Sequence, residues 1–168
     1  MSAPPLAYVG LGANLANAAD TPAQTLHAAV DALATLPQTR LTATSRVYIS
    51  DPVDADGPQF FNQVASLQTR LPAQALLDRL QSIEQSFGRE HPYRNAPRTL
   101  DLDLLMLDEQ QIDSPRLTLP HPRMHQRLFV LMPLAEMDPS LVIPGRGTVA
   151  ACLDAVLATQ TQRCAPAP

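Results

Sequence analysis

The spacing of apolar residues alternates between a strand period and a helix period along residues 6–107, and this alternation restricts the possible folds more than any other feature. Apolar runs and strict alternation predict strands at 6–11, 41–48, 62–69 and 99–107. Steps of three and four predict the two intervening helices, which run from Pro22 until Pro37 and from Pro72 until Gly88. The order βαββαβ is that of the α+β ferredoxin-like sandwich, in which helices cover one face of an antiparallel sheet.

Further elements are predicted after this core, as C-terminal additions to the sandwich. They are a short hairpin at 111–119, a short helix at 127–136 and a last helix at 148–158. A chain of 168 residues has the length of one packed domain, so we expect a single domain over 1–168. Its proline- and alanine-rich ends, 1–5 and 165–168, carry too little apolar surface to order themselves, and we expect both to be frayed.

Composition excludes several classes of function. Twelve basic and sixteen acidic residues give a formal net charge of −4, so the chain lacks the basic field that holds a nucleic acid. All twelve basic residues are arginine, which excludes P-loop and Schiff-base chemistry that depends on lysine. Cys152 and Cys164 form no metal-binding or disulfide pattern, and apolar runs such as Leu104–Leu107 are too short to cross a bilayer. We therefore expect a cytoplasmic protein that binds neither nucleic acid nor membrane.

The strongest chemical signal is a pair of aspartates, Asp101 and Asp103, in the last strand of the predicted sandwich. Side chains at i and i+2 of a strand share one face and lie about 6.6 Å apart along it, while Leu100, Leu102 and Leu104 take the other face. Two converging carboxylates suit a pair of divalent ions, and oxygen ligands beside arginine suit Mg²⁺ that carries a polyphosphate. An ordinary strand with its aspartates in water is the alternative, but aspartate is disfavoured in strands, so we favour the metal site.

Half of the arginines surround this strand: Arg89, Arg94, Arg98, Arg116, Arg123 and Arg127. Forked guanidinium donors bind phosphate oxygens bidentately and neutralise the charge that develops in phosphoryl transfer. Acidic residues in the same window leave open that these are exposed ion pairs. His121 stands between two prolines, which hold the backbone extended and orient the imidazole, although a lone histidine is more often structural.

A second group of residues suits a flat heterocycle. Phe60 and Phe61 are adjacent, and because neighbouring strand residues face opposite sides, one of them is available for stacking. The next residue, Asn62, can both donate and accept hydrogen bonds. The same residues could instead pack at the edge of the core under a loop, and the sequence alone leaves both interpretations open.

Two glycine-containing patterns partly match known binding motifs, one for dinucleotides and one for calcium, but neither match is complete. Gly10 and Gly12 follow the first strand as in dinucleotide-binding folds, but Leu15 occupies the third glycine position and no helix starts there. The acidic segment 54–57 resembles part of a calcium loop, but Pro52 stands where the first ligand must be. We exclude both kinds of site and expect the acidic segment to belong to a mobile surface lid.

The sequence RNAPRTLDLDLL, from Arg94 to Leu105, resembles the signature of the 6-hydroxymethyl-7,8-dihydropterin pyrophosphokinase family of folate biosynthesis. Other segments match motifs of that family in the same order, namely Gly12–Leu15, Phe60–Asn62, Ile83–Glu84, Gly88–Arg89, Pro120–His121 and Arg127–Phe129. The matched motifs lie within residues 6–145. The ferredoxin-like fold of the family agrees with the predicted order of elements.

The resemblance implies an ATP-dependent diphosphotransferase, in which the pterin hydroxymethyl oxygen attacks the β-phosphorus of Mg·ATP and AMP is released. It implies that Asp101 and Asp103 hold two Mg²⁺ ions and act in catalysis with Arg98 and Arg127. The residues implied to bind the pterin are Ser50, Asp51, Val53, Phe60, Asn62 and Phe129. The residues implied to line the ATP site are Leu77, Gln81, Glu84, Arg89, Arg98, Leu104, Arg116, Thr118, His121 and Arg127. We expect a monomer whose partners are these small molecules.

Two other functions remain open from the residues themselves. Another two-metal nucleotidyltransferase or phosphotransferase would place the same aspartate pair on a strand and use a different acceptor. A ferredoxin-like ligand-sensing module would bind a cation at the pair without turnover. A pterin analogue, Mg²⁺ and a nucleotide at saturation should raise the melting temperature cooperatively only for the pterin pyrophosphokinase. The sensor requires no turnover.

Overall fold

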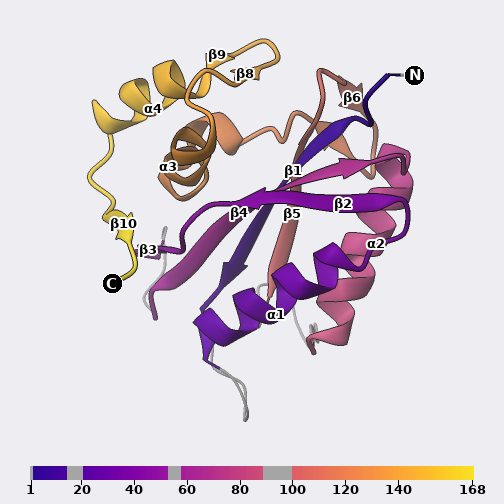
Figure 1. Cartoon of the computed structure of the whole chain (residues 1–168). Coiled ribbons are helices and arrows are strands. Elements are labelled where there is room, and N and C mark those ends of the chain that lie inside the picture. Colours follow the sequence, from indigo (N-terminus) through magenta and orange to yellow (C-terminus); the bar gives the residue numbers. More distant parts are fainter. Residues whose placement is uncertain (1, 15–20, 53–57, 89–99) are drawn as a thin grey trace.

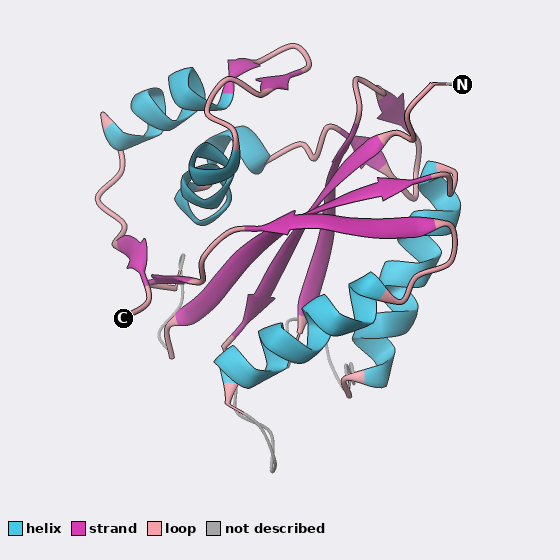
Figure 2. Ribbon diagram, in the orientation of Figure 1, coloured by secondary structure: helices cyan, strands magenta, loops and turns pink. Residues whose placement is uncertain are grey.

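The computed structural model describes residues 2–14, 21–52, 58–88 and 100–168. The strands of the main sheet are β1 (Leu6–Ala13), β2 (Thr39–Thr44), β3 (Tyr48–Ser50), β4 (Phe60–Thr69), β5 (Asp101–Leu107) and β10 (Cys164–Pro166). The helices are α1 (Pro22–Ala34), α2 (Ala73–Ser86), α3 (Leu128–Met137) and α4 (Val149–Leu157), with a 3-10 turn, η1 (Met124–Gln126). Two small hairpins are formed by β6 (Ile112–Asp113) with β7 (Thr118–Leu119), and by β8 (Val142–Ile143) with β9 (Gly147–Thr148). Figure 1 and Figure 2 show the sheet between two groups of helices.

The main sheet is antiparallel throughout, and its strands follow the order β10-β3-β4-β1-β5, with β2 also paired to β4. β1 is a central strand that pairs with β4 on one side and with β5 on the other. The register places Gly12 of β1 opposite both Asn62 and Asp101, and it places Gly10 opposite Asp103. The predicted α+β ferredoxin-like topology is therefore confirmed, and its central strand separates the predicted aromatic strand from the predicted aspartate strand.

Different helices cover the two faces of the main sheet (Figure 1). On one face α1 and α2 bury a first core that includes Leu26, Leu76 and Leu104. On the other face α3 and α4 bury a second core that includes Tyr8, Leu105 and Leu131. The second core fills only part of its face, and the rest of that face carries the aspartates of β5.

A capping box confirms the predicted start of the first helix. Thr21 Oγ1 accepts a hydrogen bond from the backbone N–H of Gln24 at 3.2 Å, and Gln24 Oε1 accepts one from the N–H of Thr21 at 2.8 Å. Pro22 begins α1, at a position where a backbone N–H would have no partner within the helix. The helix ends at Ala34, just before Pro37.

The additions after β5 follow the predicted order. The hairpin of β6 and β7, α3 and α4 each lie within one residue of their expected bounds. α3 begins directly after Arg127, so its first turn places Phe129 near the open part of the sheet. None of the helices in the described ranges has the length and apolar character needed to cross a bilayer.

Two sequence-based expectations are wrong. The single strand expected at 41–48 is divided into β2 and β3, because Ser45 turns the chain: its N–H donates to Val64 O at 2.8 Å, and its Oγ accepts from Val64 N–H at 3.0 Å. The frayed end expected at 165–168 is ordered instead, because β10 pairs with β3. Just beyond β10, the N–H of Ala167 donates to Val47 O at 2.8 Å.

Candidate active site

Asp101 and Asp103 face the same side of the main sheet, as the alternation on β5 predicts. Leu100, Leu102 and Leu104 face the opposite side and are buried, with exposed fractions of 0%, 5% and 3%. The Asp103 side chain is half exposed, at 48% of its surface. The leucines therefore anchor the strand in the core while both carboxylates are presented to one pocket.

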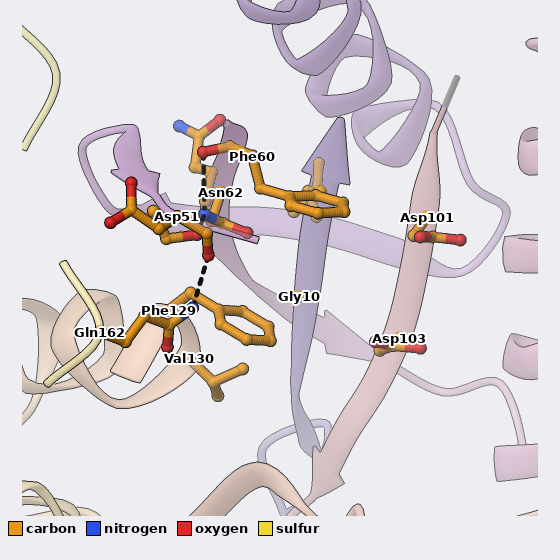
Figure 3. Close-up of a pocket in the computed structure, with 13 residues that line it drawn as sticks. Gly10, Asp51, Phe60, Asn62, Asp101, Asp103, Phe129, Val130 and Gln162 are labelled. Carbon is orange, nitrogen blue, oxygen red and sulfur yellow. Dashed lines mark hydrogen bonds between the residues drawn. The ribbon is translucent and has the colours of Figure 1, made fainter. Parts of the chain in front are cut away.

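That pocket brings together residues from distant parts of the chain (Figure 3). Besides the two aspartates, it is lined by Ser50 at the end of β3, by Asp51 directly after it, by Phe60 and Asn62 of β4 and by Phe129 of α3. Figure 3 shows Phe60 and Phe129 extending toward β1 from the side opposite the aspartates. All the residues predicted to bind the pterin line this pocket except Val53, which lies outside the described residues.

β1 forms the floor of the pocket, and two of the residues that it contributes are glycines. Gly10 and Gly12 both line the pocket. A Cβ atom at Gly12 would lie 3.7 Å from Asn62 Oδ1, so any side chain there would project beside this amide. Glycine in a strand often marks a place where a ligand approaches the backbone closely. Without side chains at these positions, the floor between the aspartates and the phenylalanines is open.

Asn62 is fixed by its hydrogen bonds and is 4% exposed. Its Nδ2 donates to Ser50 Oγ at 2.9 Å and to the carbonyl oxygens of Tyr48 and Phe60 at 3.3 Å. These bonds tie β4 to β3 at the wall of the pocket and hold the amide in one orientation. Because these bonds engage the amide hydrogens, the atom of Asn62 that is preorganised to bind a ring is the acceptor Oδ1.

A second pocket shares Asp103 with the first. It brings together five of the residues predicted to line the ATP site, namely Leu77, Leu104, Arg116, Thr118 and His121. In the described part of the chain, Asp103 is the one residue that lines both pockets. Two ligands bound in these pockets would therefore meet at a carboxylate.

Arg127 lies beside the carboxylate that the two pockets share, although it lines neither of them. Its Nη1 lies 3.9 Å from Asp103 Oδ2, and its guanidinium carbon lies 5.5 Å from the centroid of the Phe129 ring. Burial lowers the pKa of Arg127, and the Asp103 carboxylate partly opposes this effect. The group remains a cation at neutral pH, so a half-buried positive charge lies beside the shared carboxylate.

The other residues predicted for the ATP site do not line the second pocket in the described part of the chain. Gln81 is exposed on α2, whereas Glu84 on the same helix is buried with 3% of its surface exposed. Glu84 Oε2 accepts a hydrogen bond from the backbone N–H of Leu102 at 2.9 Å. Arg89 and Arg98 lie outside the described residues. The structure thus gives Glu84 a role that the sequence did not predict, which is to hold β5 against α2.

Glu84→Ala is expected to lower the free energy of unfolding by about 2 kcal/mol, because it leaves the buried N–H of Leu102 without its acceptor. Glu84→Gln keeps an acceptor oxygen and should lose less. Urea unfolding monitored by circular dichroism measures both changes. Equal stability of the alanine variant and the parent protein would contradict this structural role.

His121 lies in the second pocket as a neutral imidazole. Its Nδ1 accepts a hydrogen bond from the backbone N–H of Arg123 at 3.1 Å, which places the proton on Nε2. Burial lowers the pKa of His121; the Asp103 carboxylate opposes this, and the charges of Arg127 and Arg123 add to it. The Nε2–H group is therefore a donor for an anionic ligand near pH 7.

The lowered pKa of His121 predicts that stability falls as the pH decreases below the ordinary histidine pKa of about 6.5. Between that value and the lower folded-state pKa, the unfolded chain binds a proton that the native imidazole does not, so the free energy of unfolding rises with pH. His121→Gln should reduce this slope in urea unfolding followed from about pH 5 to about pH 8. His27→Gln, at an exposed site on α1, is the control. An unchanged slope in the His121 variant would be the contrary result.

The chain supplies two carboxylates toward a metal site, and this donor set fits magnesium. Among the residues that the structure describes, there is no group of three or more His, Cys, Asp and Glu side chains that could hold a metal ion. Mg²⁺ is commonly bound by one or two carboxylates together with water and substrate phosphates. Asp101 and Asp103 match this pattern, because they share one face and open into the pocket.

Sequence reasoning missed several residues of the first pocket: Gly10, Leu11, Gly12, Gln63, Val130 and Gln162. The glycines were visible as a pattern, but their role depends on β1 lying between β4 and β5. Gln162 lies in a segment without periodicity, so the sequence carries no signal for its position.

The comparisons with known proteins agree with one another. A sequence model of the family described as 7,8-dihydro-6-hydroxymethylpterin-pyrophosphokinase matches residues 8–139. The 2-amino-4-hydroxy-6-hydroxymethyldihydropteridine pyrophosphokinase of Pseudomonas aeruginosa is 51% identical over 138 residues, which cover 82% of this chain and 83% of that protein. The protein of the same name from Haemophilus influenzae is 45% identical over 139 residues, which cover 82% of this chain and 84% of the relative.

Solved structures show the same fold. A Plasmodium falciparum HPPK-DHPS structure with pteroate matches 92% of this chain with a TM-score of 0.74 and 12% identity. An HPPK-DHPS structure in complex with substrates matches 93% with a TM-score of 0.73 and 12% identity. This chain spans 45% and 44% of the length of those two chains, so the likeness concerns one part of each.

Proposed function

Because the chain belongs to the 7,8-dihydro-6-hydroxymethylpterin-pyrophosphokinase family, it is an ATP-dependent pyrophosphokinase of folate biosynthesis, and we propose that its two pockets hold the two substrates. The single observation that supports this assignment best is that Asp103 lines both pockets. Pyrophosphoryl transfer requires the acceptor oxygen and the β-phosphorus to meet in line, close to groups that neutralise phosphate charge. The guanidinium of Arg127, 3.9 Å from Asp103 Oδ2, supplies a cation beside the carboxylate at which the two substrates would meet.

The first pocket is the proposed pterin site. Phe60 and Phe129 approach β1 from two different elements, which suits a ring held between aromatic faces. Asn62 would bind the edge of the ring, and the backbone at the end of β3, at Ser50 and Asp51, would complete the wall. The substrate's hydroxymethyl group would then point toward β5.

The second pocket is the proposed ATP site. Leu77 and Leu104 give it an apolar surface for the adenine, and Arg116, Thr118 and His121 give it donors for ribose and phosphate oxygens. Arg127 would bind the phosphates nearest Asp103. From the family resemblance we also propose four further residues for this site: Gln81, Glu84, Arg89 and Arg98. Because Glu84 is bonded to the backbone of Leu102, we propose that it positions β5 at this site.

The reaction that we propose forms a bond between the pterin hydroxymethyl oxygen and the β-phosphorus, and it breaks the bond from that phosphorus to the oxygen that bridges to the α-phosphate. AMP leaves with the bridging oxygen, and the hydroxyl proton passes to solvent. No side chain is required as a general base, because catalysis of this kind rests on positioning and charge neutralisation. Arg127 and Arg98 are the proposed cations that stabilise the transferred group.

Asp101 and Asp103 are proposed to hold two Mg²⁺ ions, which supply charge neutralisation for the phosphates when they are bound. The carboxylates themselves set the position of the phosphate chain relative to the pterin floor. Their place on a strand anchored by buried leucines limits their movement during turnover.

The test is a ³¹P spectrum of the purified chain incubated with Mg·ATP and 6-hydroxymethyl-7,8-dihydropterin. AMP and a new pterin diphosphate are expected. Accumulation of ADP would indicate transfer of the γ-phosphate only, and no turnover despite binding of both ligands would indicate a sensor. Either outcome would overturn the proposed reaction.

We also propose that the chain acts as a monomer in the cytoplasm and that residues 1–168 form one pyrophosphokinase domain. The residues assigned to the two substrates line neighbouring pockets that share Asp103, and this supports a single domain that holds both substrates. Sedimentation at the concentration of the activity assay tests this proposal, and a dimer that is active only when associated would overturn it.

A further inference from the structure

The segment after α4 returns to the pocket that we assign to the pterin. It lies beyond residue 139, where the family match ends. Gln162 of this segment lines the pocket together with Asp51 and Phe129 (Figure 3). None of the residues predicted from the family resemblance lies in this part of the chain.

Three sets of hydrogen bonds hold the segment in place. Gln160 Nε2 donates to Gln126 O at 2.8 Å, directly before Arg127. Gln162 Nε2 donates to Asp51 O at 2.6 Å, and Asp51 N–H donates to Arg163 O at 3.1 Å. β10 then pairs with β3 in antiparallel register. The segment therefore connects the turn before α3 with the wall that follows β3.

Asp51 is the point where this connection reaches the pocket. Both of its backbone polar groups bond to the C-terminal segment, the carbonyl through a side chain and the N–H through the backbone. Its carboxylate oxygen Oδ1 accepts from Gln59 Nε2 at 3.1 Å. The N–H belongs to the peptide unit between Ser50 and Asp51 and the carbonyl to the unit that follows, so these bonds hold the peptide planes on both sides of Asp51. Its neighbour Ser50 is in turn bonded to Asn62.

We propose that Gln162 is a positioning residue of the pterin site, which holds the Asp51 carbonyl and thereby fixes the wall formed by Ser50 and Asp51. The inference rests on the proposed assignment of this pocket to the pterin. It adds the segment after α4 to the binding machinery, although no residue of that segment needs to touch the reacting atoms. The effect is specific to the pterin, because Gln162 does not line the second pocket.

Gln162→Ala tests the proposal in the full chain with Mg²⁺ and a non-hydrolysable ATP analogue present at saturation. We expect the Kd for the reduced pterin, measured by calorimetry, to rise about fivefold, which is the usual effect of losing one neutral hydrogen bond. The KM for the pterin should rise by a similar factor, while kcat and the KM for ATP stay close to those of the parent protein. Thr161→Ala, at the exposed neighbouring position, is the matched control and should bind the pterin as the parent does.

Gln162→Glu separates the hydrogen bond from mere packing, because it keeps the shape of the side chain. The ionised carboxylate cannot donate to Asp51 O and should weaken pterin binding more than alanine does. A protonated carboxyl can donate, so the affinity of this variant relative to the parent protein should recover as the pH is lowered toward about 4.3. A structural role without the donor would not produce this recovery.

The outcomes separate the two proposals. Parent-like pterin binding by Gln162→Ala would overturn the positioning role and leave the proposed function standing. If Gln162→Ala weakened the binding of both the pterin and the ATP analogue and also lowered the free energy of unfolding in urea, the role of Gln162 would be generally structural. That result would also overturn the positioning role. Failure of the parent chain itself to bind the pterin would overturn the proposed function, and this inference with it.

Discussion

Replacing Asp103 by alanine is expected to lower kcat at least about a thousandfold, which corresponds to roughly 4 kcal/mol of transition-state stabilisation. Asp103 is the carboxylate at which the two pockets meet, so its loss removes a proposed metal ligand and a fixed point between the proposed substrate sites. The fold should survive, because β5 is held by leucines on its other face and the Asp103 side chain is half exposed. AMP release at saturating substrates measures the rate, and urea unfolding measures the stability.

Two further variants make this result specific. Asp103→Asn keeps the size of the side chain and removes its charge, so it should be nearly as inactive as the alanine variant. Asp113→Ala removes a carboxylate from the exposed hairpin strand β6 and should turn over at close to the parent rate. Near-normal kcat in the Asp103→Ala variant would remove the basis for the metal assignment.

Arg127→Ala is expected to reduce kcat about a thousandfold, the lower end of the range for a cation that stabilises a transferred phosphoryl group. Its guanidinium lies between the shared carboxylate and the Phe129 ring. Loss of the cation above that ring should also raise the KM for the pterin, by a smaller factor than the change in kcat. Steady-state kinetics with each substrate varied in turn distinguish the two effects.

Arg127→Lys keeps the positive charge but replaces the planar fork by a single ammonium group, so an intermediate rate is expected. Arg123→Ala removes an exposed arginine nearby and should have little effect on kcat. If the alanine variants at 127 and 123 lost activity equally, a general loss of positive field would explain both, and the specific role of Arg127 would be wrong.

Local sequence rules predicted the parts of the fold that local physics determines. Pro22 marked the start of α1, and the alternation at Asp101 and Asp103 gave the correct faces of β5. The order of elements then restricted the topology to the ferredoxin-like arrangement. The family resemblance contributed the aromatic pair, because nothing in the spacing of Phe60 and Phe129 indicates that they meet.

Tertiary arrangement determined what the sequence did not show. The family resemblance implied that Glu84 lines the ATP site, but the approach of β5 buries it against the N–H of Leu102. β10 contains too few residues for a period and includes Pro166, so its pairing depends on β3 offering a partner edge. Ser45 interrupts the expected strand because it bonds to Val64 across the sheet.

Gly10 and Gly12 are two positions at which a substitution is expected to change activity without changing the stability of the fold. A Cβ at either site would meet its nearest neighbours at ordinary contact distances, 3.6 Å from Leu105 at Gly10 and 3.7 Å from Asn62 at Gly12. Neither backbone has the positive φ that penalises other residues. Alanine at these two positions should therefore leave expression and thermal stability close to those of the parent protein. The same two variants should support less growth without supplied folate, because each added methyl group lies on the surface that we propose for the pterin ring.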